Sequence, residues 1–136
     1  MQYDAPYEIT KRSGDAGYDL RAMEDVVLKQ GEPVMVEPGA RFNFDEDMAG
    51  LLLLRSSMGA RGVVLLNSVG VIDSSYNGPG DTVRALIMKV TDGEPVKISK
   101  GERFCQMVFA KISSDEMERG EWEQATNRSG FGSTGT

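Results

Sequence analysis

Short apolar runs recur along most of the chain, and glycine, proline, asparagine or aspartate separates each run from the next. Residues 24–44, EDVVLKQGEPVMVEPGARFNF, predict two or three strands with turns at Gln30-Gly31 and Pro38-Gly39. The runs GLLLLRSS, GVVLLNSVGVID, TVRALIMKV and PVKISKGERFCQMVFAKI continue the pattern, with breakers at Asn77-Gly78-Pro79-Gly80 and Asp92-Gly93. Strand-length runs with regular turn signals predict an all-β sandwich or barrel.

Helical periodicity is hard to find, and we expect at most a short helical turn near Ser114 to Arg119. The last predicted strand ends near Ile112, so the pattern predicts one β domain over residues 1–112 and a separate segment over residues 113–136. That segment holds one Trp, one Phe and little else that is apolar. Disorder, a lid, or an arm that docks on another subunit would each account for it.

Composition narrows the classes of function. With 21 acidic and 15 basic residues the net charge is −6, so the chain is a poor general binder of nucleic-acid backbone and must handle any phosphate locally. The absence of histidine excludes Ser-His and Cys-His nucleophile pairs, and a single cysteine excludes an internal disulfide and a thiolate zinc site. No secretion signal or membrane span is recognisable, so we expect a soluble cytoplasmic protein without a membrane partner.

Three breaker-rich stretches gather the remaining chemistry. They hold Asp19, then Arg55-Ser56-Ser57, then Asn67 with Asp73 and Tyr76. Small hydroxyls beside an arginine suit an oxyanion, and a carboxylate at a strand end can orient and deprotonate a water. Each residue also has a purely structural interpretation, as a turn cap, a polar strand end or a packing aromatic.

The last residues, RSGFGSTG from Arg128 to Gly135, pose a separate question. One large ring, Phe131, stands between two glycines and follows an arginine. A passive tail would contain such a sequence only by chance, whereas glycines also permit an arm to move and to approach a ligand closely.

Five segments, in this order, resemble the five motifs of the trimeric dUTP pyrophosphatases (dUTPases). They are AGYDLRA at 16–22, RSSMGARG at 55–62, NSVGVIDSSYNG at 67–78, KGERFCQMVF at 100–109 and RSGFGSTG at 128–135. The resemblance covers almost the whole chain. It implies a jelly-roll-like β-sandwich that assembles as a homotrimer, with active sites shared between chains and a glycine-rich C-terminal arm that closes over each site.

The resemblance implies that the arm contacts the nucleotide. Phe131 would stack on the uracil ring, and Arg128 would meet the γ-phosphate. Gly132 and Ser133 would be further substrate contacts, with the region around Ser133 covering the phosphates.

The third motif would hold the nucleoside and the reacting water. Asp73 would orient the water that attacks the α-phosphorus, and Tyr76 would pack under the deoxyribose and exclude a 2′-hydroxyl. Asn67 and backbone groups of the same hairpin, Val71 among them, would read the uracil edge.

The second and fourth motifs would hold the phosphates. Ser56 and the amide of Ser57 would bind them, Gln106 would assist, and Arg55 would sit on the phosphate side. The resemblance implies Mg²⁺ as cofactor, chelated mainly by the substrate phosphates, with Asp19 near it through water.

The implied function is hydrolysis of dUTP to dUMP and pyrophosphate, which keeps uracil out of DNA and supplies dUMP for thymidylate synthesis. Two alternatives stay open: a dCTP deaminase-like enzyme, and a dUTPase-fold regulatory protein that signals through a protein partner. The chain departs from the family pattern at Ser75, where a second acid is usual, at Leu54 in place of proline, and in a fifth motif shortened by two residues. These departures suggest a bacteriophage or prophage branch, for which a regulatory partner is an added expectation.

Overall fold

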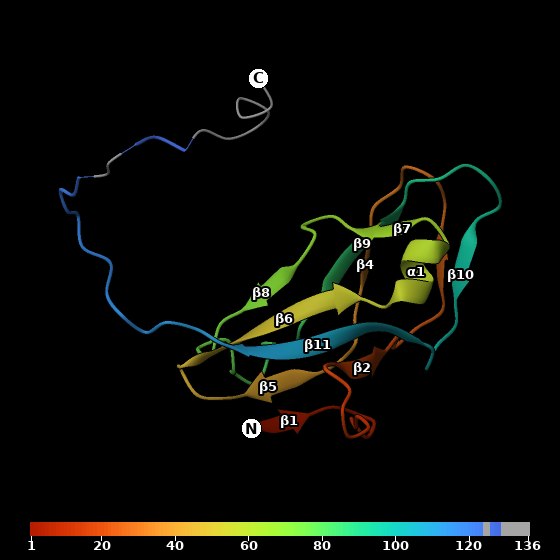
Figure 1. Cartoon of the computed structure of the whole chain (residues 1–136). Helices are drawn as coiled ribbons and strands as arrows, with labels where there is room; N and C mark the ends of the chain where they lie inside the picture. Colours follow the sequence, from red (N-terminus) through yellow and green to blue (C-terminus); the bar gives the residue numbers. More distant parts are fainter. Residues whose placement is uncertain (124–125, 129–136) are drawn as a thin grey trace.

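The computed structural model describes residues 1–123 and 126–128. Their regular structure consists of eleven strands and one short helix, α1 (Ser56–Ala60). The strands are β1 (Gln2–Asp4), β2 (Tyr18–Arg21), β3 (Val26–Leu28), β4 (Val34–Val36), β5 (Arg41–Asn43), β6 (Met48–Leu54), β7 (Val63–Leu65), β8 (Gly70–Ile72), β9 (Ala85–Lys89), β10 (Val96–Ile98) and β11 (Arg103–Lys111). The all-β prediction is confirmed, and the fold is a jelly-roll-like sandwich (Figure 1).

The strands form four antiparallel groups with long crossovers between sequence-distant partners. The largest sheet has the order β2-β11-β6-β8, and a three-stranded sheet has the order β4-β9-β7. Two further pairs, β1-β5 and β10-β3, complete the pairing. The longest strand, β11, lies beside β6 through seven residue pairs from Cys105–Leu54 to Lys111–Met48. This pair of strands positions the candidate site residues.

Side chains that alternate along the strands fill a single core. In β11 the inward positions include Cys105 and Met107, in β6 Leu52, and in the facing sheet Ile87 and Val63, all at most 2% exposed. Full burial of an aliphatic side chain stabilises a fold by about 1.5–3 kcal/mol, so these positions hold the two sheets together. Burial also raises the pKa of the Cys105 thiol, which keeps it protonated and unreactive.

An aromatic group closes one end of the core. The Phe109 ring on β11 meets the rings of Tyr18, Phe42 and Phe44 edge-on, with centroids 5.2–6.1 Å apart. Edge-to-face pairs of this kind add stabilisation beyond their buried area. The group ties β2 and β5 to β11.

The segment from Ser114 to Arg119, where the sequence allows at most a short helical turn, has none. Residues 112–123 have no regular secondary structure, and they run away from the body of the molecule as an extended segment (Figure 1). Met117 is 98% exposed and Trp122 is 81% exposed, so no apolar contact supports a short helix there. The one helix of the described residues is α1, whose five residues cannot cross a membrane.

Candidate active site

Three segments that are far apart in the sequence meet at one end of the four-stranded sheet. Asp19 on β2 lies opposite Gln106 on β11 in the antiparallel register. Arg55 follows β6 directly, and its backbone N–H donates to the carbonyl of Phe104 at 3.1 Å. Ser56 and Ser57 then begin α1 and are exposed. We call Asp19, Arg55, Ser56, Ser57 and Gln106 the arginine cluster.

The Arg55 guanidinium is held from two sides within this cluster. Its Nε lies 3.3 Å from Oδ1 of Asp19, and its Nη1 donates to the carbonyl of Arg103 at 3.3 Å. The side chains of Arg55 and Asp19 remain 38% and 32% exposed. The guanidinium therefore has a fixed orientation and still presents N–H groups to solvent, as a site for an oxyanion requires.

A cavity of about 380 Å³ lies against the cluster, lined by Gly14, Asp15, Ala16, Gly17, Asp19, Arg55, Ser56 and Gln106. Gly17 packs closely against the Gln106 side chain, and only glycine leaves room for it in this position. A Cβ at residue 17 would lie 2.2 Å from Oε1 of Gln106. The Gln106 amide is also anchored, because its Nε2 donates to the carbonyl of Leu54 at 3.4 Å. Three of the motifs thus converge on one polar hollow.

A second hollow, of about 500 Å³, adjoins the first through Asp15, Gly17 and Asp19. It adds Arg21 and Arg103, which are register partners on β2 and β11 and which the sequence interpretation did not single out. Both residues lie inside motifs that resemble those of the family. That position is the signal by which the sequence could have identified them as candidates. Arg21 is anchored to the carbonyl of Gly101 by its Nη1 at 2.9 Å.

The Tyr7 side chain lines the same hollow and supports its wall. The backbone N–H of Arg21 donates to Tyr7 Oη at 3.1 Å, and the Tyr7 hydroxyl donates to the carbonyl of Pro38 at 2.6 Å. Burial raises the pKa of Tyr7, so the phenol stays neutral and keeps its donor proton. Tyr7 therefore fixes the backbone of β2 beside Asp19.

A second group of candidates surrounds the connection between β7 and β8. The hairpin that the sequence predicts here is wrong, because β7 pairs with β9 whereas β8 pairs with β6 in the other sheet. Asn67 is exposed in the connection, where Ser68 adopts a left-handed φ of 61° and its N–H donates to the carbonyl of Leu65 at 2.9 Å. Val71 on β8 is 65% exposed, and the exposed Asp73 follows this strand. We call Asn67, Val71, Asp73 and Tyr76 the hairpin cluster, after the hairpin that the sequence predicts for this segment.

Tyr76 is held at its backbone and at its ring. Its N–H donates to the carbonyl of Asp73 at 3.0 Å, and its hydroxyl donates to the carbonyl of Thr82 at 2.8 Å. The residue is 37% exposed, so part of the ring remains open to solvent. The Tyr76 ring is thus held in place, and its backbone is bonded to the backbone of Asp73.

The two clusters begin at opposite edges of the four-stranded sheet. Asp19 is on β2 at one edge and Val71 is on β8 at the other, and these strands are three strand spacings, about 14 Å, apart. Gln106 on β11 and Arg55 after β6 extend the arginine cluster between the edges. Among the described residues no side-chain hydrogen bond or ion pair joins the two clusters, and no residue of the hairpin cluster lines either polar hollow.

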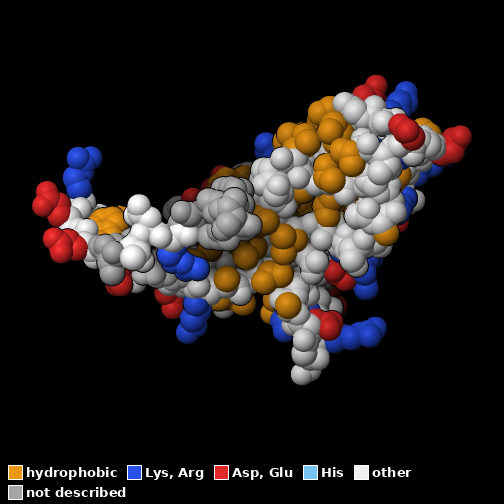
Figure 2. All heavy atoms as spheres, turned by 45° about the horizontal axis from the view of Figure 1, so that its top comes forward, with side chains coloured by type: hydrophobic (Ala, Val, Ile, Leu, Met, Phe, Trp, Pro, Cys, Tyr) orange, Lys and Arg blue, Asp and Glu red, His pale blue; other side chains and the backbone are white. Residues whose placement is uncertain are grey.

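Partly exposed apolar side chains occupy the outer face of the sheet between the clusters. The register places Leu53 beside Gln106 and Leu51 beside both Val71 and Val108, which all point to this face. Hydrophobic side chains also gather on the face seen in Figure 2. Apolar positions on the outer side of a sheet are typical of a surface that another chain covers.

The remaining candidates lie in the C-terminal segment. Arg128 is exposed, whereas Phe131, Gly132 and Ser133 lie outside the described residues. In the part of the chain that the structure describes, no three His, Cys, Asp or Glu side chains are grouped so as to hold a metal ion.

Comparison with known proteins places these clusters in a family. A model of the dUTPase family matches residues 4–135. The deoxyuridine 5′-triphosphate nucleotidohydrolase of Methylococcus capsulatus is 40% identical over 129 residues, which cover 90% of this chain and 82% of that protein. The dUTPase of Streptococcus mutans is similar in structure with a TM-score of 0.73 at 29% identity, over 86% of this chain and 100% of that chain.

A further likeness concerns the fold alone. A mutant dUTPase of Staphylococcus bacteriophage 80alpha, solved with dUpNHpp, has a TM-score of 0.78 at 24% identity, over 99% of this chain and 98% of that chain. The family model and the relative from Methylococcus capsulatus both extend over the segments that contain the arginine and hairpin clusters. On these grounds, the chain belongs to the dUTPase family.

Proposed function

We propose that this protein hydrolyses dUTP to dUMP and pyrophosphate in sites formed between the chains of a homotrimer. The observation that carries the proposal is the division of the candidate residues into two clusters. One cluster has the cationic and hydroxyl groups that a triphosphate needs, and the other has the exposed Asp73 carboxylate and, three residues later, the anchored Tyr76 ring. Relatives that are named for this reaction support the same conclusion.

The arginine cluster binds the triphosphate in this proposal. Arg55, Ser56 and Gln106 line the polar hollow and supply a guanidinium, a hydroxyl and an amide donor. The backbone amide of Ser57, in the first turn of α1, is the further donor that we propose for the phosphates. Hydrolysis of a phosphoanhydride requires position and charge stabilisation more than a covalent intermediate. Histidine is therefore unnecessary.

The hairpin cluster holds the deoxyuridine and the reacting water. Asn67 and the backbone around Val71 read the uracil edge, and the Tyr76 ring lies beneath the sugar and leaves no space for a 2′-hydroxyl. The Asp73 carboxylate accepts a proton from the water as its oxygen attacks the α-phosphorus. The bond between the α-phosphorus and the oxygen bridging to the β-phosphate then breaks, and pyrophosphate leaves.

The donor set fits a magnesium ion that is chelated mainly by the substrate. Asp19 is a partly exposed carboxylate on the wall of the phosphate hollow, which suits an outer contact through water. Mg²⁺ would neutralise charge on the phosphate oxygens. The chain itself orients Asp19 through Arg55 and keeps that side of the hollow polar.

Assembly would bring complementary clusters together. The partly exposed apolar residues between the clusters would be covered by a second chain, whose hairpin cluster would face the arginine cluster of the first. We further propose that residues 113–136 form an arm that closes over such a site, separate from the β domain of residues 1–112. Arg128 would then contact the γ-phosphate, Phe131 would stack on uracil, and Gly132 and Ser133 would complete the cover.

A turnover assay tests the proposal. The purified protein with Mg²⁺ is incubated with dUTP, dCTP or UTP, and release of pyrophosphate and of the monophosphate is measured. We expect turnover of dUTP only. Release of ammonia from dCTP would instead indicate the deaminase alternative, although β9 lacks the glutamate expected for that chemistry.

An active-site variant sharpens the test. Asp73→Asn should keep nucleotide binding and lower kcat about 10²–10⁴-fold, because the amide cannot accept the proton. Asp92→Asn, a change of the same kind in an exposed bend, serves as the control. Turnover by Asp73→Asn within a few-fold of the parent would show that Asp73 has only a turn role.

A further inference from the structure

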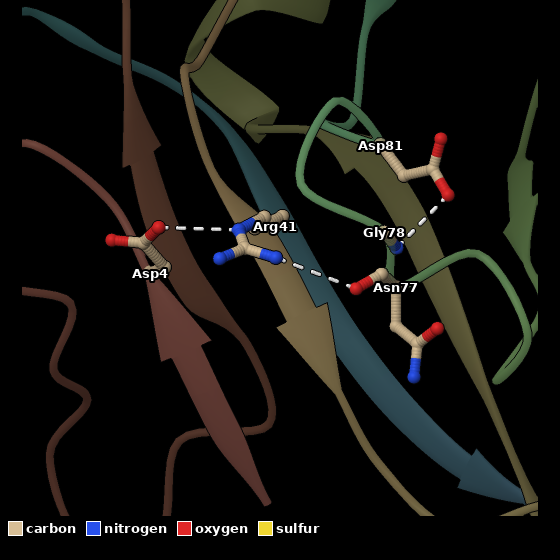
Figure 3. Close-up of polar contacts among 5 residues, drawn as sticks. All are labelled: Asp4, Arg41, Asn77, Gly78 and Asp81. Atoms are coloured by element: carbon tan, nitrogen blue, oxygen red, sulfur yellow. Dashed lines mark hydrogen bonds and ion pairs between the residues drawn. The ribbon is translucent and has the colours of Figure 1, made fainter.

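The Asn77–Gly78 peptide unit, one residue beyond Tyr76, is held at both of its polar atoms. The Asn77 carbonyl accepts from Nη1 of Arg41 at 3.4 Å, and the Gly78 N–H donates to Oδ2 of Asp81 at 3.0 Å (Figure 3). A peptide unit fixed at its oxygen and its nitrogen cannot rotate freely. Its orientation sets the path of the chain directly after the Tyr76 ring.

Arg41 reaches this loop from the neighbouring strand β5 and is itself held by β1. Its Nε lies 3.1 Å from Oδ2 of Asp4, its antiparallel register partner, and its side chain is only 33% exposed. A planar guanidinium can bind a carboxylate with one N–H and a carbonyl with another without changing its conformation. Arg41 therefore bridges the N-terminal strand and the loop after Tyr76.

A second chain of hydrogen bonds runs parallel to the first. Nδ2 of Asn77 donates to Oδ1 of Asn43 at 3.2 Å, and Nδ2 of Asn43 donates to Oε1 of Gln2 at 2.9 Å. These residues and Arg41 line a hollow of about 390 Å³ between β1, β5 and the loop. Because the polar side chains of this hollow bond to one another, they form a brace and not a site that awaits a ligand.

The far end of the loop is fixed by other contacts. The backbone N–H of Val83 donates to the carbonyl of Ala40 at 2.8 Å, and the Thr82 carbonyl accepts the Tyr76 hydroxyl. The near end has no such backbone hydrogen bond to β5, and its contacts with β5 come from the side chains of Arg41 and Asn43. Loss of the Arg41 contact would therefore free the Asn77 carbonyl, while Tyr76 and Gly78 keep the bonds of their N–H groups to Asp73 and Asp81.

We propose that Arg41, anchored by Asp4, is a positioning residue that sets sugar specificity by fixing the Asn77–Gly78 peptide and hence the Tyr76 ring. This inference rests on the proposed function, in which that ring excludes a 2′-hydroxyl. Arg41 acts through the loop and does not touch the substrate. The N-terminal strand thereby contributes to specificity from outside the matched motifs.

Two measurements on Arg41→Met test the proposal. Amide hydrogen exchange of Gly78 in the free protein should accelerate about fivefold or more, because the peptide loses its carbonyl anchor. The inhibition constant of UTP divided by the KM of dUTP should fall roughly three- to tenfold, the worth of one partly exposed charged hydrogen bond. Arg41→Lys keeps the positive charge but loses the paired N–H groups of the guanidinium, and it should give intermediate values. Asp4→Asn should also accelerate Gly78 exchange and lower the UTP to dUTP ratio.

Arg61→Met is the matched control. Arg61 also contacts one carboxylate, Glu102 at 3.6 Å, and one backbone carbonyl, that of Lys97, and its side chain is 36% exposed. This control should leave the UTP to dUTP ratio unchanged. An unchanged Gly78 exchange rate in Arg41→Met would overturn the brace, and faster exchange with an unchanged ratio would overturn the specificity role.

The readouts separate this inference from the proposed function. Hydrogen exchange is measured without nucleotide, so it tests the brace whether or not the protein hydrolyses dUTP. Absence of dUTP turnover by the parent protein would overturn the proposed function and, with it, the specificity role of Arg41. If Arg41→Met does not fold, Asp4→Asn and Arg41→Lys provide the same two readouts.

Discussion

Replacement of Gly17 by alanine tests whether the Gln106 amide acts where the structure places it. The added Cβ would lie 2.2 Å from Oε1 of Gln106, closer than atoms can approach, and 3.1 Å from its Cδ, a tight contact. The clashing atoms are the end of a flexible side chain, and Gly17 has no left-handed φ that would strain alanine. The side chain of Gln106 should therefore move while the backbone stays in place.

The expected effect on stability is small. Moving Gln106 breaks its 3.4 Å bond to the Leu54 carbonyl, a loss of at most about 1 kcal/mol for so long a contact. Alanine in place of glycine restricts the unfolded chain and returns about 0.4–1 kcal/mol. The free energy of unfolding should thus stay within about 1 kcal/mol of the parent value, as measured by chemical denaturation.

The expected effect on turnover is larger. If Gln106 donates to a charged phosphate oxygen, its displacement removes a bond worth about 1.5–3 kcal/mol and lowers kcat/KM for dUTP roughly ten- to hundredfold. Gln106→Ala should show a similar loss, and the double variant should lose little more, because both changes remove the same contact.

A matched glycine controls for the substitution itself. Gly59→Ala adds its methyl group to open space and should leave kcat/KM unchanged. If Gly17→Ala turns over dUTP as fast as the parent, the Gln106 amide has no part in binding. Gln106 would then not belong to the arginine cluster. If the losses of Gly17→Ala and Gln106→Ala multiply in the double variant, the two changes act independently and the steric argument is wrong.

Three other predictions concern the core and the C-terminal segment. Met58→Ala should lower the free energy of unfolding by about 2–5 kcal/mol in a denaturant titration, because Met58 is the buried residue of α1 and is only 1% exposed. A loss under about 1 kcal/mol would contradict its packing role. Burial raises the pKa of Cys105, so a thiol reagent should react only after unfolding, and stability should decline as the pH rises above the ordinary thiol range; fast labelling of the native protein would refute this. Deletion of residues 128–136 should leave the thermal transition in place and greatly lower dUTP turnover, and full turnover by the truncated protein would make the segment a passive tail.

Most strands could be predicted because their residues carry the pattern locally. β6 and β11 are both long, mostly apolar runs, MAGLLLL and RFCQMVFAK, and that composition is a property of each segment by itself. β1 carries no such signal, since Gln2, Tyr3 and Asp4 are all exposed and the strand exists through pairing with β5. The helix α1 is similarly short, and the burial of Met58 that supports it is a tertiary contact.

The site was predictable as a set of residue types but not as an arrangement. Asp19, Arg55 and Gln106 lie in matched motifs, yet their contacts depend on β2, β11 and β6 being neighbours. The separation of the two clusters follows from the strand order, which no local pattern encodes. Arg41 escaped notice because it stands in an ordinary strand, and only the fold brings it to the loop after Tyr76.

Complementation between two inactive variants tests the central claim most directly, namely that each site joins the arginine cluster of one chain to the hairpin cluster of another. Arg55→Ala and Asp73→Asn are co-expressed in equal amounts, and dUTP turnover is compared with each variant alone. Random assembly pairs an intact arginine cluster with an intact hairpin cluster in about a quarter of the sites, so roughly a quarter of the parental activity should return. Activity in the mixture no higher than that of the separate variants would contradict the shared site.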